Sequence, residues 1–248
     1  MQRLIIDSHV HLHDNSFSED RADILSSVKA AVICTASKSD FLSAKKLAQE
    51  FENAYFAVGI HPEYTAELDF SVQAEMENLL QDEKCIALGE IGLDGYFPER
   101  EKQLSVFTAQ MEIVEKYNKP VILHCRKMNE ELFSVLKKFP LVKAVYHGFT
   151  SGPELAERAA NAGLMIGIGT GLLFPNAKRI LNTVKEIPLE KMLLESDAPF
   201  MPPKKGERNT PLNILSVAEK IAEIKQTETG EVLRQNIENF KNFFHTEV

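Results

Sequence analysis

Histidines and acids in this chain fall at the carboxyl ends of apolar runs, and this placement restricts the folds that the chain can adopt. His9 and His11 close the first run, and four further side chains stand at or just beyond the ends of later runs, namely Glu90, His124, His147 and Asp197. These six side chains can meet only if the runs are parallel strands closed into a ring, because the carboxyl ends of such strands share one face. The sequence therefore predicts an α/β fold, a (β/α)8 TIM barrel with parallel strands.

Eight runs have the composition of strands, and most are continuously apolar, as parallel strands covered on both faces are. They are Leu4–Asp7, Ala30–Thr35, Tyr55–Ile60, Cys85–Gly89, Pro120–His124, Lys143–His147, Leu164–Gly169 and Met192–Glu195. Segments of helical period lie between them, such as the stripe Leu104, Phe107, Met111 and Val114. Thr210-Pro211 precedes an apolar helical face that runs to Ile221, and a closing helix is expected from Val232 to Phe244.

The alternation of strand and helix over 248 residues suits one barrel domain spanning 1–248. A doubly wound open sheet is the alternative, and length alone also permits two small domains. An open sheet would hold its edge strands too far apart for ligands on the first, fourth, fifth, sixth and eighth runs to meet. This favours the closed ring.

Charge and cysteine content limit the setting of the protein. The net charge of −8 argues against a uniformly basic surface that coats nucleic acid, but it is compatible with a nuclease that binds a short stretch of strand through metals and a few local cations. The three cysteines lie in or beside apolar runs, which indicates free thiols and a reducing compartment. Neither a signal peptide nor an apolar run long enough for a bilayer is evident. We expect a soluble cytoplasmic enzyme with no membrane partner. A monomer is the expected state, and the sequence leaves the oligomeric state open.

The segment Asp7-Ser8-His9-Val10-His11 places two imidazoles two residues apart at a strand end. Residues i and i+2 of an extended chain point to the same side, so both rings can face one ion. Surface histidines in a turn are the alternative. Glu90 follows a buried run directly, where a carboxylate is costly unless it is paired or bound to metal, and there it could bridge two cations. For Asp94, a metal ligand and a salt-bridged loop acid are both open.

His124 and His147 end successive runs, at positions that face the same mouth in a barrel. Asp197 is placed to bind a metal and to orient or deprotonate its water. We treat Asp197 and Glu90 as the catalytic residues, with Asp197 as the best candidate for the general base. Glu195 is given a structural role only.

Phosphate-binding candidates form a separate set. Arg126 and Asn209, together with the basic residues Lys204, Lys205 and Arg208, could neutralise a phosphate, although a solvated loop explains the lysines nearly as well. His61 is interpreted as a substrate-side hydrogen-bond donor or as a turn residue.

At this point the ordered motifs resemble the TatD family of metal-dependent deoxyribonucleases, within the amidohydrolase superfamily. The resemblance runs from about His9 to Pro211 and rests on these segments: Asp7-Ser8-His9-Val10-His11, Gly59-Ile60-His61-Pro62, Gly89-Glu90-Ile91-Gly92-Leu93-Asp94, Leu123-His124-Cys125-Arg126, His147-Gly148-Phe149, Glu195-Ser196-Asp197-Ala198-Pro199 and the loop from Pro202 to Pro211. Each motif alone is modest, whereas their ordered combination is specific.

The resemblance implies a TIM barrel that hydrolyses DNA phosphodiesters, typically from a 3′ end, with two divalent cations. It implies that His9, His11, Glu90 and Asp197 hold one metal, and that Glu90 bridges to a second metal held with His124 and His147. Arg126 and Asn209 would lie near the substrate phosphate. The chain departs from the family pattern at Gly95, at Lys127-Met128-Asn129 and at Ser196. These changes remove no predicted ligand, but they leave substrate preference open.

The leading hypothesis is a binuclear metal-dependent phosphodiesterase acting on DNA ends, single-stranded or frayed, with Mg, Mn, Zn or a similar metal. A small-molecule amidohydrolase, lactonase or esterase with the same metal centre is the first alternative. A non-catalytic barrel scaffold is the second, and the complete ligand set argues against it.

Overall fold

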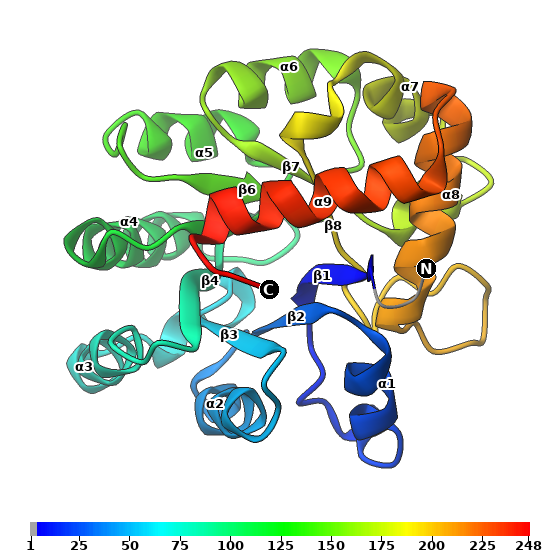
Figure 1. Cartoon of the computed structure of the whole chain (residues 1–248). Helices are drawn as coiled ribbons and strands as arrows, with labels where there is room; N and C mark the ends of the chain where they lie inside the picture. The colour runs from blue at the N-terminus through cyan, green and yellow to red at the C-terminus, as the bar shows by residue number, and fades with distance from the viewer. Residues whose placement is uncertain (1–3) are drawn as a thin grey trace.

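The computed structural model describes residues 4–248, and it confirms the predicted TIM barrel. Eight parallel strands form one sheet in the order β1-β2-β3-β4-β5-β6-β7-β8, with helices around the outside (Figure 1). The strands are β1 Ile6–Val10, β2 Ala30–Cys34, β3 Ala54–Val58, β4 Cys85–Asp94, β5 Val121–Arg126, β6 Ala144–Tyr146, β7 Met165–Ile168 and β8 Met192–Leu194. The predicted domain includes residues 1–3, which lie outside the described part.

The helices follow the strands in the expected alternation. They are α1 Arg21–Ser27, α2 Phe41–Glu50, α3 Phe70–Leu79, α4 Arg100–Tyr117, α5 Asn129–Leu136, α6 Pro153–Asn161, α7 Lys178–Glu186, α8 Ile214–Lys225 and α9 Thr229–Phe244. The apolar stripe of α4 is buried at Phe107, Met111 and Val114, as its spacing predicts. The expected cap at Thr210-Pro211 instead begins a short 3-10 helix over Pro211–Asn213, and the Thr210 side chain makes no capping hydrogen bond.

Helix α9 plays a part that the sequence does not suggest. It crosses the end of the barrel at which the strands begin (Figure 1). Phe240, Phe243 and Phe244 pack there against apolar side chains contributed by most of the strands, including Ile6 and Leu193. Because apolar surface is removed from water on both sides, this helix closes the barrel floor and leaves the opposite end as the open mouth.

The ring is closed between β8 and β1 largely by side chains instead of a regular strand ladder. Asn236 of α9 donates to the Ile6 carbonyl at 3.2 Å and accepts the Leu194 N–H at 2.9 Å. Ser8 Oγ donates to the Leu194 carbonyl at 3.0 Å. Nearer the mouth the backbone takes over, with the Asp197 N–H donating to the His9 carbonyl at 3.0 Å. We call this junction the β8–β1 seam.

Two strands differ from the predicted runs at the mouth. β1 is shifted toward the mouth, so that His9 lies inside it, and β4 continues through Glu90 to Asp94. The continuation has a physical basis, since β5 keeps pairing with β4 until Asp94 lies opposite Arg126. Gly92 permits this close approach: it has φ +145°, and a Cβ there would overlap the carbonyl oxygen of His124.

Candidate metal centre

All six predicted ligands converge at the mouth of the barrel. β1 contributes His9 and is followed by His11, β4 contributes Glu90, and β5 contributes His124. His147 directly follows β6, and Asp197 lies in the loop after β8. His61, which follows β3, and Asp94, the last residue of β4, stand beside them. The geometric expectation drawn from the apolar runs is therefore met.

His9 and His11 form the first half of the centre. Their Nε2 atoms are 3.1 Å apart, as two same-side rings of an extended chain can be. The Nδ1–H of His11 donates to the Cys34 carbonyl at 3.0 Å, which leaves a lone pair on its Nε2. Asp197 Oδ1 lies 3.6 Å from His9 Nε2 and 3.5 Å from His11 Nε2. Two imidazole nitrogens and a carboxylate thus face one point.

Glu90 connects this half to a second one. Its Oε2 lies 3.5 Å from His9 Nε2, while its Oε1 lies 2.7 Å from both His124 Nδ1 and His147 Nε2. The Nε2 atom of His61 is 3.9 Å from the same Oε1. The two oxygens of one carboxylate therefore face two separate groups of imidazoles.

Two further acids hold the outer nitrogens of the second group. Asp94 Oδ2 is 3.0 Å from His124 Nε2, so His124 turns its Nδ1 toward Glu90. Glu195 Oε1 is 3.4 Å from His147 Nδ1 and accepts the Gly148 N–H at 2.5 Å. Carboxylates in such positions set the orientation of an imidazole and raise its basicity. Asp94 pairs with His124 and lies 3.6 Å from Arg126, and Glu195 contacts His147 and the Gly148 N–H.

Asp197 is held in place by a connection that sequence reasoning missed. The Asp7 carboxylate accepts the Ser196 N–H at 2.9 Å and the Ser196 hydroxyl at 2.5 Å, across the β8–β1 seam. Burial raises the pKa of Asp7 to about 7, against the hydrogen bonds from Ser196, which lower it. Asp197 itself has φ +57°, in the left-handed region where non-glycine residues are uncommon. The only signal in the sequence is the acid Asp7, two positions before His9. Its hydrogen-bond partner Ser196 lies 189 residues away in the chain.

The charges in the centre are unequal. Burial acts to raise the pKa of Glu90, but His147, His9 and His61 outweigh it and hold that pKa well below its usual value. Burial acts to lower the pKa of His147, but Glu90 and Glu195 raise it well above the ordinary value. Burial and the charge of His147 together lower the pKa of His9. The centre thus combines an ionised Glu90 and a neutral His9 with a His147 that favours its protonated form, and a bound cation would displace that proton because metal ligands are deprotonated.

The donor atoms fit divalent cations. Three sets of ligand atoms lie close enough to share an ion, namely His9, His11 and Glu90, then His9, His147 and Asp197, then His61, Glu90 and His124. Imidazole nitrogens mixed with carboxylate oxygens suit Zn, Mn, Fe or Ni. In addition, His9 Nε2 and His11 Nε2 face each other so closely that a proton or a cation must lie between them.

The predicted phosphate-binding residues lie in different settings. Arg126 reaches the mouth with a side chain 56% exposed, and its Nη1 atom lies 3.6 Å from Asp94 Oδ2. The Nδ1 of His61 accepts the Glu63 N–H at 3.2 Å, which directs its Nε2 toward Glu90. His61 thus stabilises the turn after β3 through its Nδ1 and faces the metal centre with its Nε2.

Asn209 and Arg208 require corrections. Asn209 is fully buried, and its Nδ2 donates to the Ser196 and Phe200 carbonyls at 2.6 and 2.7 Å. Its Oδ1 accepts the Thr210 N–H at 2.9 Å, so the amide holds the loop after β8 and does not face the mouth. Arg208 pairs with Asp20 and lies over the Phe17 ring, away from the ligands. Lys204 and Lys205 are exposed, as a solvated loop predicts.

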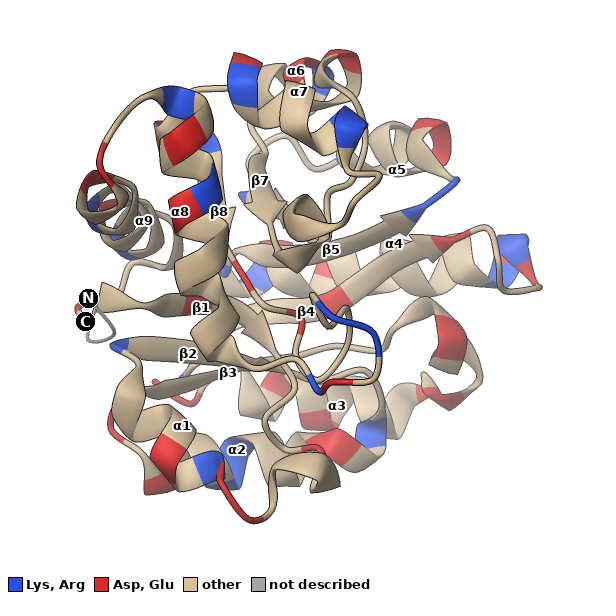
Figure 2. Cartoon of the chain, turned by 90° about the vertical axis from the view of Figure 1, so that its right-hand side faces the viewer, with Lys and Arg blue, Asp and Glu red and all other residues tan. Residues whose placement is uncertain are grey.

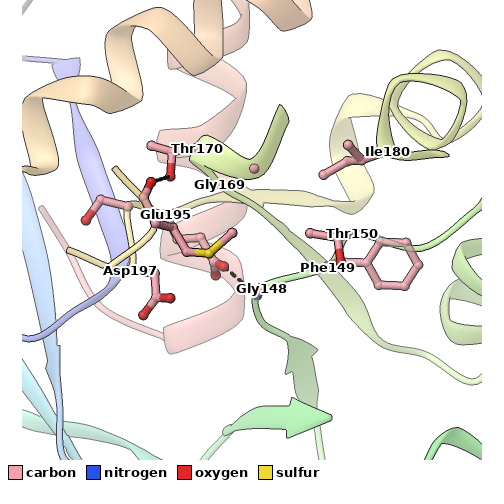
Figure 3. Close-up of a pocket in the computed structure, with 11 residues that line it drawn as sticks. Gly148, Phe149, Thr150, Gly169, Thr170, Ile180, Glu195 and Asp197 are labelled. Atoms are coloured by element: carbon pink, nitrogen blue, oxygen red, sulfur yellow. Dashed lines mark hydrogen bonds between the residues drawn. The ribbon is translucent and has the colours of Figure 1, made fainter. Parts of the chain in front are cut away.

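A small hollow adjoins Asp197 (Figure 3). Glu195, Gly148, Gly169 and Thr170 are among its lining residues. The hollow brings solvent-accessible space to the side of Asp197 that faces β6 and β7.

A closed α/β barrel with buried imidazoles and carboxylates at its mouth is the architecture of metal-dependent hydrolases, and the comparisons agree. The family described as TatD related DNase matches residues 6–245. The chain is 30% identical to the uncharacterized metal-dependent hydrolase YabD of Bacillus subtilis, over 97% of this chain and 99% of that protein. The crystal structure of YjjV, a TatD homologue from Escherichia coli, superposes with a TM-score of 0.92 at 28% identity, covering 100% of both chains. A TatD family hydrolase from Entamoeba histolytica superposes with a TM-score of 0.88 at 25% identity, over 98% of this chain and 99% of that one.

The chain therefore belongs to the TatD-related family of metal-dependent hydrolases. Among residues 4–248, no helix is long and apolar enough to cross a membrane.

Proposed function

We propose that this protein is a deoxyribonuclease that hydrolyses phosphodiester bonds at DNA ends, with two divalent cations at the barrel mouth. The observation that carries the proposal is the position of Glu90. Its Oε2 faces His9 while its Oε1 faces His124 and His147, at distances of 3.5, 2.7 and 2.7 Å. A carboxylate so placed can serve two neighbouring ions, and paired ions are typical of enzymes that cleave phosphate esters.

Each half of the centre supplies ligands for one cation. His9, His11, Asp197 and Glu90 Oε2 would hold the first, and Glu90 Oε1, His124 and His147 the second. When bound, such cations polarise the phosphoryl oxygens and lower the pKa of water toward neutrality. The chain itself supplies the fixed geometry, since Asp94, Glu195 and the Cys34 carbonyl orient three of the imidazoles.

Asp197 is the residue best placed to take the proton of the attacking water. Its side chain is 21% exposed, whereas that of Glu90 is 7% exposed. Its backbone is fixed by the hydrogen bond to the His9 carbonyl, and the hollow beside it gives access for solvent. A general base must reach both water and substrate, and Asp197 meets that condition.

Two features support DNA as the substrate. The family description names a DNase. Arg126 ends β5 with an exposed guanidinium at the mouth, and Lys204 and Lys205 are exposed in the loop after β8, whose basic residues are blue in Figure 2. The net charge of −8 makes binding depend on these local groups and on bound metal, and we infer little discrimination among base sequences.

Three buried free thiols suit a reducing compartment, and we propose a cytoplasmic location.

The test is hydrolysis of a 3′-labelled oligonucleotide by metal-loaded protein, run beside a panel of lactones and amides. Wild-type protein is expected to shorten the oligonucleotide in the presence of Mg²⁺ or Mn²⁺. Asp197→Asn and Glu90→Ala are expected to abolish hydrolysis while retaining the circular dichroism spectrum of the barrel. Asp23→Asn, which changes an exposed acid of α1, is the matched control and is expected to remain active.

Unimpaired hydrolysis by either variant would remove that residue from the mechanism. Turnover of a lactone or an amide without cleavage of DNA would replace the nuclease by a small-molecule hydrolase.

A further inference from the structure

Two large aromatic side chains stand exposed on opposite flanks of the metal centre. Phe200, in the loop after β8, is 55% exposed, and Tyr96, just after β4, is 56% exposed. Because β4 and β8 are four strands apart in a ring of eight, their loops lie across the mouth from each other. A line from one aromatic to the other therefore passes over the ligand set.

Phe200 is held rigidly at the edge of the centre. Its ring meets that of the ligand His11 edge to face, with centroids 5.4 Å apart. Its N–H donates to the Asp197 carbonyl at 2.8 Å, and its carbonyl accepts from the buried Asn209 amide at 2.7 Å. These bonds fix the backbone so that the apolar ring stays in solvent, which is unfavourable unless another group covers it. Met201 beside it is 37% exposed and extends the apolar edge.

Tyr96 is fixed in a different chemical setting. Its N–H donates to Asp94 Oδ1 at 2.8 Å, and the preceding Gly95 N–H donates to the Arg126 carbonyl at 2.8 Å. The Arg126 guanidinium carbon lies 4.3 Å from the ring centroid, and Lys127 Nζ lies 3.9 Å from it. Both cations lie over the Tyr96 ring, so a base that stacks on Tyr96 must displace one of these exposed side chains, which can then contact a phosphate.

We propose that Phe200 and Tyr96 stack on unpaired bases of a single-stranded DNA end whose scissile phosphate lies over the metal centre, with Arg126 and Lys127 facing its backbone. This inference rests on the proposed nuclease function. Aromatic rings stack on any base, so the contact is tolerant of sequence, whereas bases inside a duplex are already paired and stacked. The acidic chain cannot draw its affinity from overall charge, and stacking supplies an attraction that does not depend on charge.

The experiment compares kcat/KM for two 3′-labelled strands of equal length. One is oligothymidine, and the other carries tetrahydrofuran units, which lack bases, at its 3′ end. Wild-type protein is expected to favour the strand with bases. Phe200→Leu and Tyr96→Leu are each expected to reduce that preference by about five- to 150-fold, the range of one base–aromatic stack. Phe200→Tyr and Tyr96→Phe keep an aromatic ring and are expected to retain the preference.

Leu141→Ala, which changes an exposed apolar side chain between α5 and β6 at the opposite end of the barrel, is the distant control. Equal cleavage of both strands by wild-type protein would overturn the stacking inference and leave the nuclease function standing. An undiminished preference in both leucine variants would likewise overturn the stacking inference and leave the nuclease function standing. Failure of wild-type protein to cleave either strand would overturn both proposals.

Discussion

Replacing Asn236 with leucine is expected to weaken the β8–β1 seam more than any exposed substitution could. The Asn236 amide is 3% exposed and serves two backbone groups, the Ile6 carbonyl at 3.2 Å and the Leu194 N–H at 2.9 Å. Leucine has a similar size but no hydrogen-bonding group, so both backbone groups would stay buried without a partner. Each such group costs about 1–3 kcal/mol, which gives a loss of about 2–6 kcal/mol in the free energy of unfolding.

The assay is urea unfolding followed by far-ultraviolet circular dichroism, with the midpoint and slope fitted for each protein. Asn182→Leu is the matched control, because Asn182 is exposed on α7 and its replacement is expected to change stability by less than about 0.5 kcal/mol. A loss below about 1 kcal/mol for Asn236→Leu, at an unchanged slope, would refute the assignment of this side chain to ring closure.

Two further predictions concern titratable groups outside the predicted ligand set. Asp40 accepts the N–H groups of Ala36 and Ser37, and His13 and these bonds lower its pKa against the effect of burial. Its stabilising contribution is therefore present above the unfolded-state pKa near 3.8 and is lost on acidification. Asp40→Asn is expected to lower the free energy of unfolding in urea by about 1.5–3 kcal/mol at pH 7. The difference in stability between wild type and variant is expected to shrink below about pH 4, and a difference independent of pH would contradict this prediction. Burial raises the pKa of Cys85 to about 12 and that of Cys125 to about 11, and all three cysteines are buried free thiols. Iodoacetamide at pH 8 is therefore expected to label no thiol of the native protein and all three thiols after unfolding. Rapid labelling of the native protein would contradict this prediction.

The strands and the ligand set were predictable because their signals are local. Continuous apolar runs predict strands covered on both faces, and the parallel topology then brings their carboxyl ends to one mouth. The i, i+2 spacing of His9 and His11 likewise predicts two rings on one side, and their Nε2 atoms are indeed 3.1 Å apart.

The remaining features depend on partners that are distant in sequence. Asn209 stands in a polar loop, and only the fold shows that its amide is consumed by the Ser196 and Phe200 carbonyls. Asn236 lies on a helix that gives no sign of reaching Ile6 and Leu194 across the seam. Such roles arise from tertiary packing, which neither composition nor periodicity encodes.

The most direct test of the account is an anomalous difference map from a crystal of this protein grown with zinc. Two peaks are expected on either side of Glu90, each about 2.0–2.2 Å from one of its carboxylate oxygens. The first should lie among His9, His11 and Asp197, and the second between His124 and His147. A single peak, or none within bonding distance of Glu90, would contradict the two-cation centre on which the proposed function depends.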